Sequence, residues 1–190
     1  MPGTGRPRTE GTDAAVLAAA MELLAERGYD GLTMEGVAAR AGVAKTTVYR
    51  RWPSRAELVL EVANQIAAPV RMTPTGDLRA DLVSALRDII GVLDAPIARR
   101  IIPRILADAR DSEELTAVLT AFWTNRRGRL RGLLTAGVQS GEIRPDLDLE
   151  VAADALYGPV WYRYLVTRAP LSKLAAEAIV DRALDGMRPG

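Results

Sequence analysis

Cysteine and histidine are both absent from this sequence of 190 residues, and aromatic residues make up only 5% of it. Without cysteine the chain has no disulfide, no thiolate nucleophile and no cysteine-ligated zinc site. Without histidine it lacks the commonest general base and the commonest metal ligand. We therefore expect no cofactor, no metal and no enzyme activity.

Long apolar runs are also missing. No segment is long enough to span a bilayer, and residues 1–6 lack the apolar core of a signal peptide. Together with the absence of cysteine, this favours a cytoplasmic protein. Lysine occurs only at Lys45 and Lys173, beside abundant arginine, alanine and glycine, which is typical of a GC-rich bacterial genome.

What the sequence does contain favours helices. Hydrophobic residues make up 48% of the chain, enough to bury a sizeable core in one or two domains. Alanine and leucine outnumber β-branched and aromatic residues, and no segment alternates as a strand would. The composition thus predicts an all-α fold.

Residues 37–54 are typical of two short helices joined by a tight turn. Gly42 stands where the chain must leave the first helix with a positive φ, which glycine adopts without steric cost. Ala38 allows a close helix crossing, and Val43 and Val48 are expected to pack the second helix onto the first. This is the pattern of a helix-turn-helix. The outward positions of the second helix carry side chains that can bind phosphates or base edges: Lys45, Thr46, Thr47, Tyr49 and Arg50.

The charge distribution agrees with this interpretation. Residues 36–56 contain five basic residues and no acidic one, whereas the whole chain has a net charge of only +1. A basic patch on an otherwise acidic protein is the electrostatic signature of phosphate binding. The alternative is a small solvated helical pair with incidental charges.

We expect three segments along the chain. Residues 1–11 are predicted to be a flexible arm, in which Arg6 and Arg8 either reach into a DNA minor groove or have no role. Residues 12–68 form a helix-turn-helix domain: a first helix capped by Thr12 or Asp13, a second capped by Thr33, and a linking fourth helix opened by the Ser54–Glu57 capping box.

The proline- and glycine-containing residues 69–76 mark the domain boundary, and residues 77–190 form a larger helical body. Its helices are expected at about 77–93, 97–109 with a kink at Pro103, 111–139, 149–167 with an interruption at Gly158-Pro159, and 172–187. The chain should therefore have about nine helices in all.

Residues 32–38 (LTMEGVA) and 41–58 (AGVAKTTVYRRWPSRAEL) resemble the DNA-binding head of the tetracycline-repressor (TetR) family of bacterial regulators. Trp52 and Arg55 stand where that family usually has phenylalanine and lysine, so this chain keeps an aromatic residue and a cation at these two positions. Residues 141–148, 156–159 and 162–163 resemble one subgroup of the family's ligand-binding domains.

The resemblance implies a homodimeric transcription factor, usually a repressor, that a small molecule releases from its DNA operator. Carried over by position, Thr33 and Tyr49 would contact phosphates, although Tyr49 also suits packing. Lys45, Thr46, Thr47 and Arg50 would lie over base edges or the adjacent backbone, while Thr46 also suits the start of a helix. Arg55, at the start of the fourth helix, is either a phosphate anchor or a surface cation.

The C-terminal body should supply the dimer and the ligand pocket. The last two helices are the candidate dimer surface, and packing inside the chain is the alternative for each of their apolar residues: Leu156, Val160, Tyr164, Ile179, Ala183 and Leu184. The resemblance implies a ligand pocket in this body, and a few aromatics with an arginine suit a planar or amphiphilic guest. The candidate residues, each with core packing as the alternative, are Arg104, Phe122, Trp123, Tyr157 and Trp161.

A second function class is a small-molecule carrier or enzyme that uses the helical body alone, without specific DNA binding. Asp108, Asp111 and Glu114 lie near Arg104 and Arg110 in the sequence and would be its acids. No histidine, cysteine or glycine-rich phosphate loop accompanies them, so a solvated face is the competing interpretation.

Overall fold

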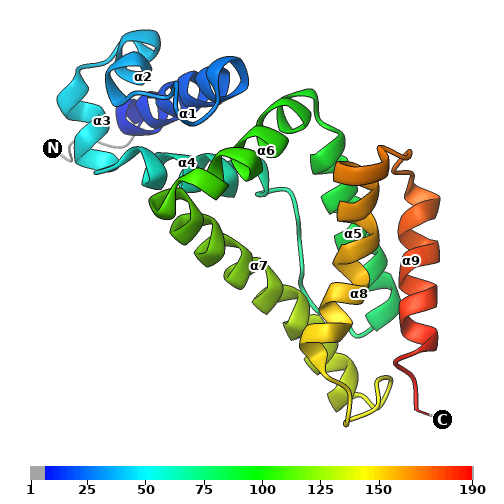
Figure 1. The fold of residues 1–190 in the computed structure, drawn as a ribbon. Coiled ribbons are helices and arrows are strands. Elements are labelled where there is room, and N and C mark those ends of the chain that lie inside the picture. The colour runs from blue at the N-terminus through cyan, green and yellow to red at the C-terminus, as the bar shows by residue number, and fades with distance from the viewer. Residues whose placement is uncertain (1–6, 190) are drawn as a thin grey trace, which may run out of the picture. The chain divides into compact units, whose positions relative to one another are not determined.

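The computed structural model describes residues 7–189, and these residues contain helices, turns and loops but no strand (Figure 1). In chain order the elements are α1 (Pro7–Arg27), α2 (Met34–Ala41), α3 (Lys45–Arg51), α4 (Arg55–Ile66), α5 (Leu78–Asp94), α6 (Pro96–Asp108), the 3-10 turn η1 (Ala109–Asp111), α7 (Glu113–Gln139), α8 (Leu149–Trp161), the π-helical segment η2 (Tyr162–Thr167) and α9 (Lys173–Asp185). The all-α prediction is confirmed. Over these residues no helix combines the length and the apolar character needed to cross a membrane.

The described chain forms two compact units. Unit 1 contains the residues up to Ile66 together with Pro96–Phe122, and unit 2 contains Ala67–Ala95 and the residues from Trp123 onward. These units do not follow the predicted division at residues 69–76, because α6 and the start of α7 pack with the N-terminal helices. Whether the functions divide at residues 69–76 remains a prediction.

Unit 1 is built on local signals that the sequence carries. The Thr33 hydroxyl accepts a hydrogen bond from the Gly36 N–H at 3.0 Å and caps α2, as predicted. Gly42 ends α2 with φ +68°, in the left-handed region. The Ser54 hydroxyl accepts from the Glu57 N–H at 3.2 Å at the start of α4. These caps set the ends of the helices that carry the polar face of α3.

The start of α1 corrects the sequence-based prediction. The helix begins at Pro7 rather than at Thr12 or Asp13, and proline suits a first helical position because its missing N–H would have no partner there. Arg8 is therefore part of a helix and not of an arm. Residues 1–6 of the predicted arm, including Arg6, lie outside the described residues.

The core of unit 1 joins the N-terminal helices to α6 and α7. One face of α1, which includes Val16, Ala20 and Leu24, is fully buried, and α6 packs against this helix. Ala98 and Ile101 of α6 and Leu115 of α7 have no exposed surface. Burial of these side chains explains why residues far along the chain belong to the N-terminal unit.

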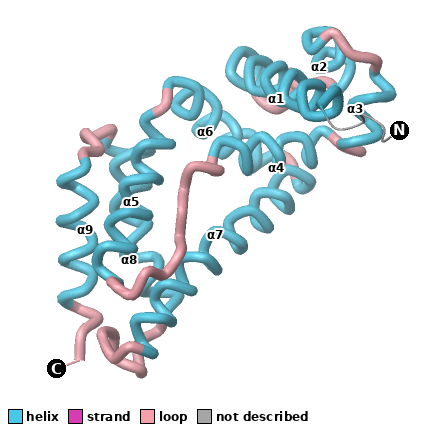
Figure 2. Tube along the Cα trace, turned by 180° about the vertical axis from the view of Figure 1, so that it is seen from behind, coloured by secondary structure: helices cyan, strands magenta, loops and turns pink. Residues whose placement is uncertain are grey.

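Unit 2 consists of the long loop of residues 67–77, α5, the rest of α7, α8, η2 and α9 (Figure 2). The apolar face of α5 is buried, from Leu78 to Ile90. Asp77 and Asp148 cap α5 and α8 through their carboxylates. Arg79 of α5 donates to Asp181 of α9 at 2.6 Å, which adds an ion pair to the apolar packing of these two helices.

The predicted interruption at Gly158-Pro159 is displaced along the chain. α8 runs through this pair to Trp161, and the helix then continues with π geometry over Tyr162–Thr167. The Tyr162 N–H donates to the carbonyls of both Gly158 and Pro159. The wider turn thus follows the proline instead of the helix breaking at it.

Candidate nucleic-acid interface

Helix α3 presents one buried side and one exposed side. Val48 has no exposed surface and Trp52 only 9%, so both belong to the core, as predicted. Val43 is half-buried. The side chains of Lys45, Thr46, Tyr49 and Arg50 are exposed, whereas Thr47 is half-buried. The helix therefore offers a polar face to a partner while Val48 fixes it to the unit.

The turn before α3 is held by backbone hydrogen bonds. The Val43 N–H donates to the Ala38 carbonyl at 3.0 Å, and the Gly42 N–H donates to the Ala39 carbonyl at 3.3 Å. These bonds satisfy carbonyls at the end of α2 and leave the chain pointing into α3. The relation between the two helices is thus set by local geometry and by the buried Ala38.

An open recess of about 320 Å³ lies beside α3 and gathers three of the predicted phosphate-binding residues. Thr33 comes from the start of α2, Tyr49 from α3 and Arg55 from the start of α4. The remaining lining residues are Leu32, Met34, Glu35, Pro53 and Ser54. A hydroxyl, a phenol, a cation and the positive end of a helix dipole suit an anionic oxygen.

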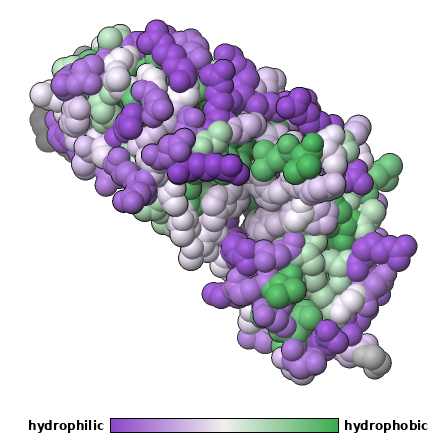
Figure 3. Space-filling view, viewed as in Figure 1, coloured by the Kyte–Doolittle hydropathy of each residue, from purple (hydrophilic) through white to green (hydrophobic). Residues whose placement is uncertain are grey.

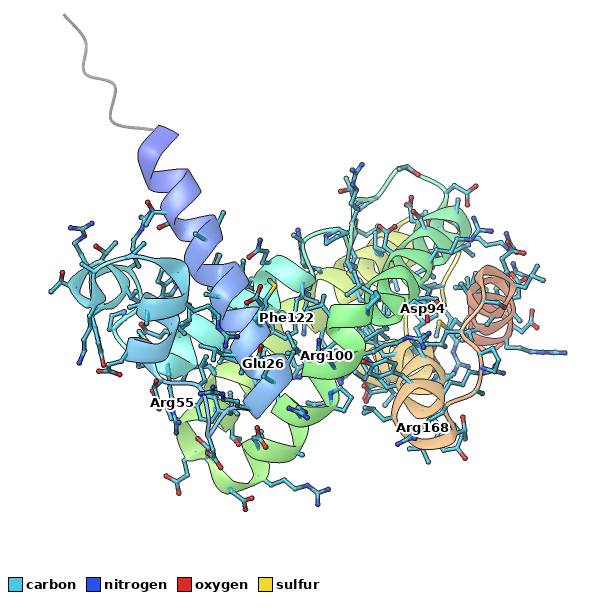
Figure 4. The ribbon with its side chains drawn as sticks, turned by 90° about the horizontal axis from the view of Figure 1, so that it is seen from above. Glu26, Arg55, Asp94, Arg100, Phe122 and Arg168 are labelled. Carbon is cyan, nitrogen blue, oxygen red and sulfur yellow. The ribbon has the colours of Figure 1, made fainter. Side chains whose placement is uncertain are left out.

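Arg55 is fixed in this recess by Tyr29. Its guanidinium lies over the Tyr29 ring, 4.0 Å from the ring centroid, and its Nη1 donates to the Tyr29 carbonyl at 3.3 Å. Figure 4 shows Arg55 in unit 1, where Phe122 also lies. The half-buried Arg55 is therefore held in place rather than extended into solvent.

Tyr29 is itself anchored from the other side. It is fully buried, its N–H donates to Asp108 Oδ2 at 2.7 Å, and its hydroxyl donates to Glu114 Oε2 at 3.3 Å. Burial raises the pKa of Tyr29 above its usual value. Asp108 and Glu114, the candidate acids of the enzyme alternative, thus have structural partners, whereas Asp111 is exposed. Among the described residues no cluster of acids suits a metal ion.

The predicted basic patch is largely neutralised by acids from outside residues 36–56. Arg40 pairs with Glu26 at 2.8 Å, and Arg51 Nε donates to Asp13 at 3.0 Å. Lys45 pairs with Glu35, and its ammonium lies 5.4 Å from the centroid of the Tyr49 ring. Arg50 is the exposed cation of α3 for which no ion-pair partner is found among the side chains that the structure describes, those of residues 11–172 and 174–189.

The predicted ligand residues fall into both units. Arg104 and Phe122 belong to unit 1, and Trp123, Tyr157 and Trp161 belong to unit 2. The five are therefore not gathered within one unit. Trp123 meets Trp161 edge to face with ring centroids 5.0 Å apart, and Trp161 meets Tyr164 in the same way at 5.7 Å. All three of these rings are half-buried.

Unit 2 contains a buried arginine that we did not predict from the sequence. Arg126 is only 8% exposed, and burial lowers the pKa of its guanidinium. Its carbonyl accepts from the Tyr157 hydroxyl at 3.4 Å, and burial raises the pKa of Tyr157 to about 12. A signal was available, because Arg126 follows the buried Leu119 by seven residues and precedes the buried Leu130 by four, which places it on their helix face.

Residues 16–62 match the family model "Bacterial regulatory proteins, tetR family", and residues 72–183 match "Tetracyclin repressor-like, C-terminal domain". This chain belongs to the TetR family. It is a helix-turn-helix transcriptional regulator, and the N-terminal match contains α2, α3 and most of α4.

TetR-family relatives cover almost the whole chain. The uncharacterized HTH-type transcriptional regulator YdeS of Bacillus subtilis is 35% identical over 97% of this chain and 93% of its own length. The DNA-binding transcriptional repressor TetR of Mycobacteroides abscessus is 29% identical over 96% of this chain and 97% of its own. The crystal structure of the TetR family transcription regulator SCO0332 is similar with a TM-score of 0.74 and 34% identity, covering 94% of this chain and 99% of that one.

The TetR-family C-terminal match spans both units. Residues 72–183 include α6 of unit 1 as well as α5, α8 and most of α9 of unit 2. The predicted dimer residues Leu156, Val160 and Leu184 are at most 3% exposed in the single chain, so they form its core and not a seam. Tyr164, Ile179 and Ala183 are half-buried.

Proposed function

We propose that this TetR-family regulator is a repressor that binds a palindromic operator as a homodimer and leaves it when a small molecule binds. The observation that carries the proposal is the exposed polar face of α3 beside the recess that contains Thr33, Tyr49 and Arg55. In this proposal α3 enters the major groove and the recess receives a backbone phosphate. Because its partner is DNA, the protein acts in the cytoplasm.

Each side chain of this face has a proposed task. Lys45, Thr46 and Arg50 are exposed and reach base edges or the phosphates beside them, whereas the half-buried Thr47 contacts the adjacent backbone. Thr33 and Tyr49 donate from their hydroxyls to phosphate oxygens, and Arg55 supplies charge from its fixed place over Tyr29.

A second copy of the chain would double these contacts. One short helix reads few base pairs, and two copies reach half-sites about 34–36 Å apart on one face of the duplex. The dimer surface is proposed on α8, η2 and α9, and Figure 3 shows hydrophobic patches on unit 2. Exposed apolar side chains of these elements support it: Val151, Tyr162, Leu165, Val166 and Leu174.

The effector is proposed to be planar or amphiphilic. We propose that it contacts the edge-to-face rings of Trp123 and Trp161, together with Tyr157, within unit 2. The other two candidates, Arg104 and Phe122, belong to unit 1. For each of the five, packing within the chain is the competing role. A shift of α4 on effector binding would change the spacing of the two α3 helices, with a coupling free energy of about 1–3 kcal/mol.

Selection of bound duplexes from a random DNA pool tests the proposal. We expect one enriched palindrome, with affinity that falls steeply as salt rises. Arg50→Ala should weaken binding to that site by about 1–3 kcal/mol, whereas Arg71→Ala, an exposed arginine of the loop before α5, should leave it unchanged. A pool without an enriched sequence would contradict specific DNA binding and favour the carrier or enzyme alternative.

A further inference from the structure

One acidic side chain stands on the proposed DNA-binding face. Glu35 is in the first turn of α2, and its carboxylate pairs with the ammonium of Lys45 at the start of α3. Both side chains are 55% exposed, so the pair faces solvent and not the core. Their hydrogen bond lowers the pKa of Glu35 and raises that of Lys45, so both groups are charged at neutral pH.

Glu35 also lines the recess proposed to receive a phosphate. It shares that recess with Thr33, Tyr49 and Arg55, and Lys45 lies over the Tyr49 ring. A phosphate that enters the recess therefore approaches a carboxylate as well as the groups that attract it. Like charges at such short range repel, and the repulsion grows as water is displaced.

When DNA binds, Lys45 either stays paired with Glu35 or moves to the DNA. On a random sequence Glu35 makes both arrangements unfavourable. If Lys45 stays with Glu35, the phosphates meet a neutral pair and gain nothing from it. If Lys45 moves to a phosphate, the Glu35 carboxylate is left bare beside the DNA backbone. A base edge with acceptors within reach of Lys45, such as guanine O6 and N7, offsets this loss through a sequence-dependent hydrogen bond.

The positions of three other cations near α3 are set by groups other than Glu35. Arg40 and Arg51 are held by Glu26 and Asp13, and Arg55 is held over Tyr29. This leaves Arg50 as the exposed cation of the α3 face available to any duplex. The Glu35–Lys45 pair therefore controls a large share of the charge that this face can offer.

We infer that Glu35 is a specificity determinant: its carboxylate competes with DNA phosphates for Lys45 and so weakens binding to arbitrary duplex more than binding to the operator. The inference rests on the proposed DNA-binding function. It assigns to Glu35 a role opposite to that of its neighbours in the recess, because Glu35 acts by excluding the wrong partner.

Glu35→Gln keeps the size of the side chain and removes its charge. Released Lys45 then neutralises one more phosphate, so the slope of log K against log salt for a scrambled duplex should steepen by about 0.9. Between about 50 and 200 mM salt this makes the affinity of the variant fall roughly three- to four-fold more than that of the wild type. The gain in affinity at low salt should be smaller on the selected operator, which lowers the specificity ratio.

The experiment compares fluorescence anisotropy of the scrambled and selected duplexes for the wild type, Glu35→Gln and Glu61→Gln. Glu61, an exposed residue of α4, provides a matched loss of one negative charge in unit 1. In a Lys45→Gln background Glu35→Gln should no longer steepen the slope. Glu35→Ala is a second test variant, and circular dichroism verifies the fold of each protein.

The outcomes separate the inference from the proposed function. If the wild type binds no duplex even at low salt, the proposed function fails. If it binds but Glu35→Gln keeps the wild-type slope, or if Glu61→Gln steepens it equally, the role of Glu35 is refuted. A steeper slope for Glu35→Gln that disappears in the Lys45→Gln background supports the inference.

Discussion

Asp108→Ala is expected to destabilise unit 1 although Asp108 lies far along the chain from the helix it supports. The carboxylate accepts the N–H of the fully buried Tyr29 at 2.7 Å. The preceding Gly28 ends α1 with φ +72°, so Tyr29 follows a helix end whose backbone groups need partners. Alanine would leave a buried N–H without an acceptor, which costs about 1–3 kcal/mol.

Urea unfolding followed by circular dichroism, at one fixed protein concentration, measures this loss. For a chain of this length each kcal/mol lowers Tm by about 2–4 °C. Asp108→Asn keeps an acceptor oxygen but not the charge, so it should lose about 1 kcal/mol. Asp111→Ala, an exposed neighbour with the same charge, is the control. A loss below about 0.5 kcal/mol for Asp108→Ala, or an equal loss for Asp111→Ala, would refute the reasoning.

Three further predictions concern the turn, a buried tyrosine and the dimer. Gly42→Ala should lower the free energy of unfolding by about 1–2 kcal/mol in the same assay. The cause is the φ of +68° and not a clash, because open space surrounds the new Cβ; Gly91→Ala, in the interior of α5, should not be destabilising. The pKa of Tyr157 is raised to about 12, so the folded protein retains a proton that the unfolded chain loses near pH 10; Tyr157 should account for about 1.4 kcal/mol of the fall in the free energy of unfolding between pH 9 and pH 11, so this fall should be smaller by that amount in Tyr157→Phe. Leu174→Asp places a charge on a side chain that is 74% exposed in the single chain, so sedimentation should show a shift to monomer without loss of helix content; an unchanged dimer would exclude Leu174 from the interface.

Features set by neighbouring residues were predictable from the sequence. Thr33 caps α2, Gly42 adopts a left-handed conformation, and Asp148 caps α8, because each depends on a few adjacent backbone groups. The buried face of α5 also follows from helical spacing. The three predicted phosphate-binding residues Thr33, Tyr49 and Arg55 do line one recess, although their contact with DNA remains a prediction.

Features set by distant residues were not predictable. The position of Asp13 predicted a helix cap, but its carboxylate accepts a hydrogen bond from Arg51, which lies 38 residues away. Tyr29 binds Asp108, 79 residues away. Such pairs depend on how helices pack, and the spacing of residues along the chain contains no record of that packing. For the same reason the sequence did not indicate that α6 joins the N-terminal unit.

The charge of the α3 face shows what this difference means for function. Counted along the chain, residues 36–56 are strongly basic, which suggests binding through general attraction to phosphates. In the folded unit Asp13, Glu26 and Glu35 each hold one of these cations. General attraction is therefore reduced while the hydrogen-bonding groups of α3 stay exposed. Because a regulator must find one site among many competing ones, the ratio of specific to nonspecific affinity matters more than either alone, and these tertiary ion pairs act on that ratio.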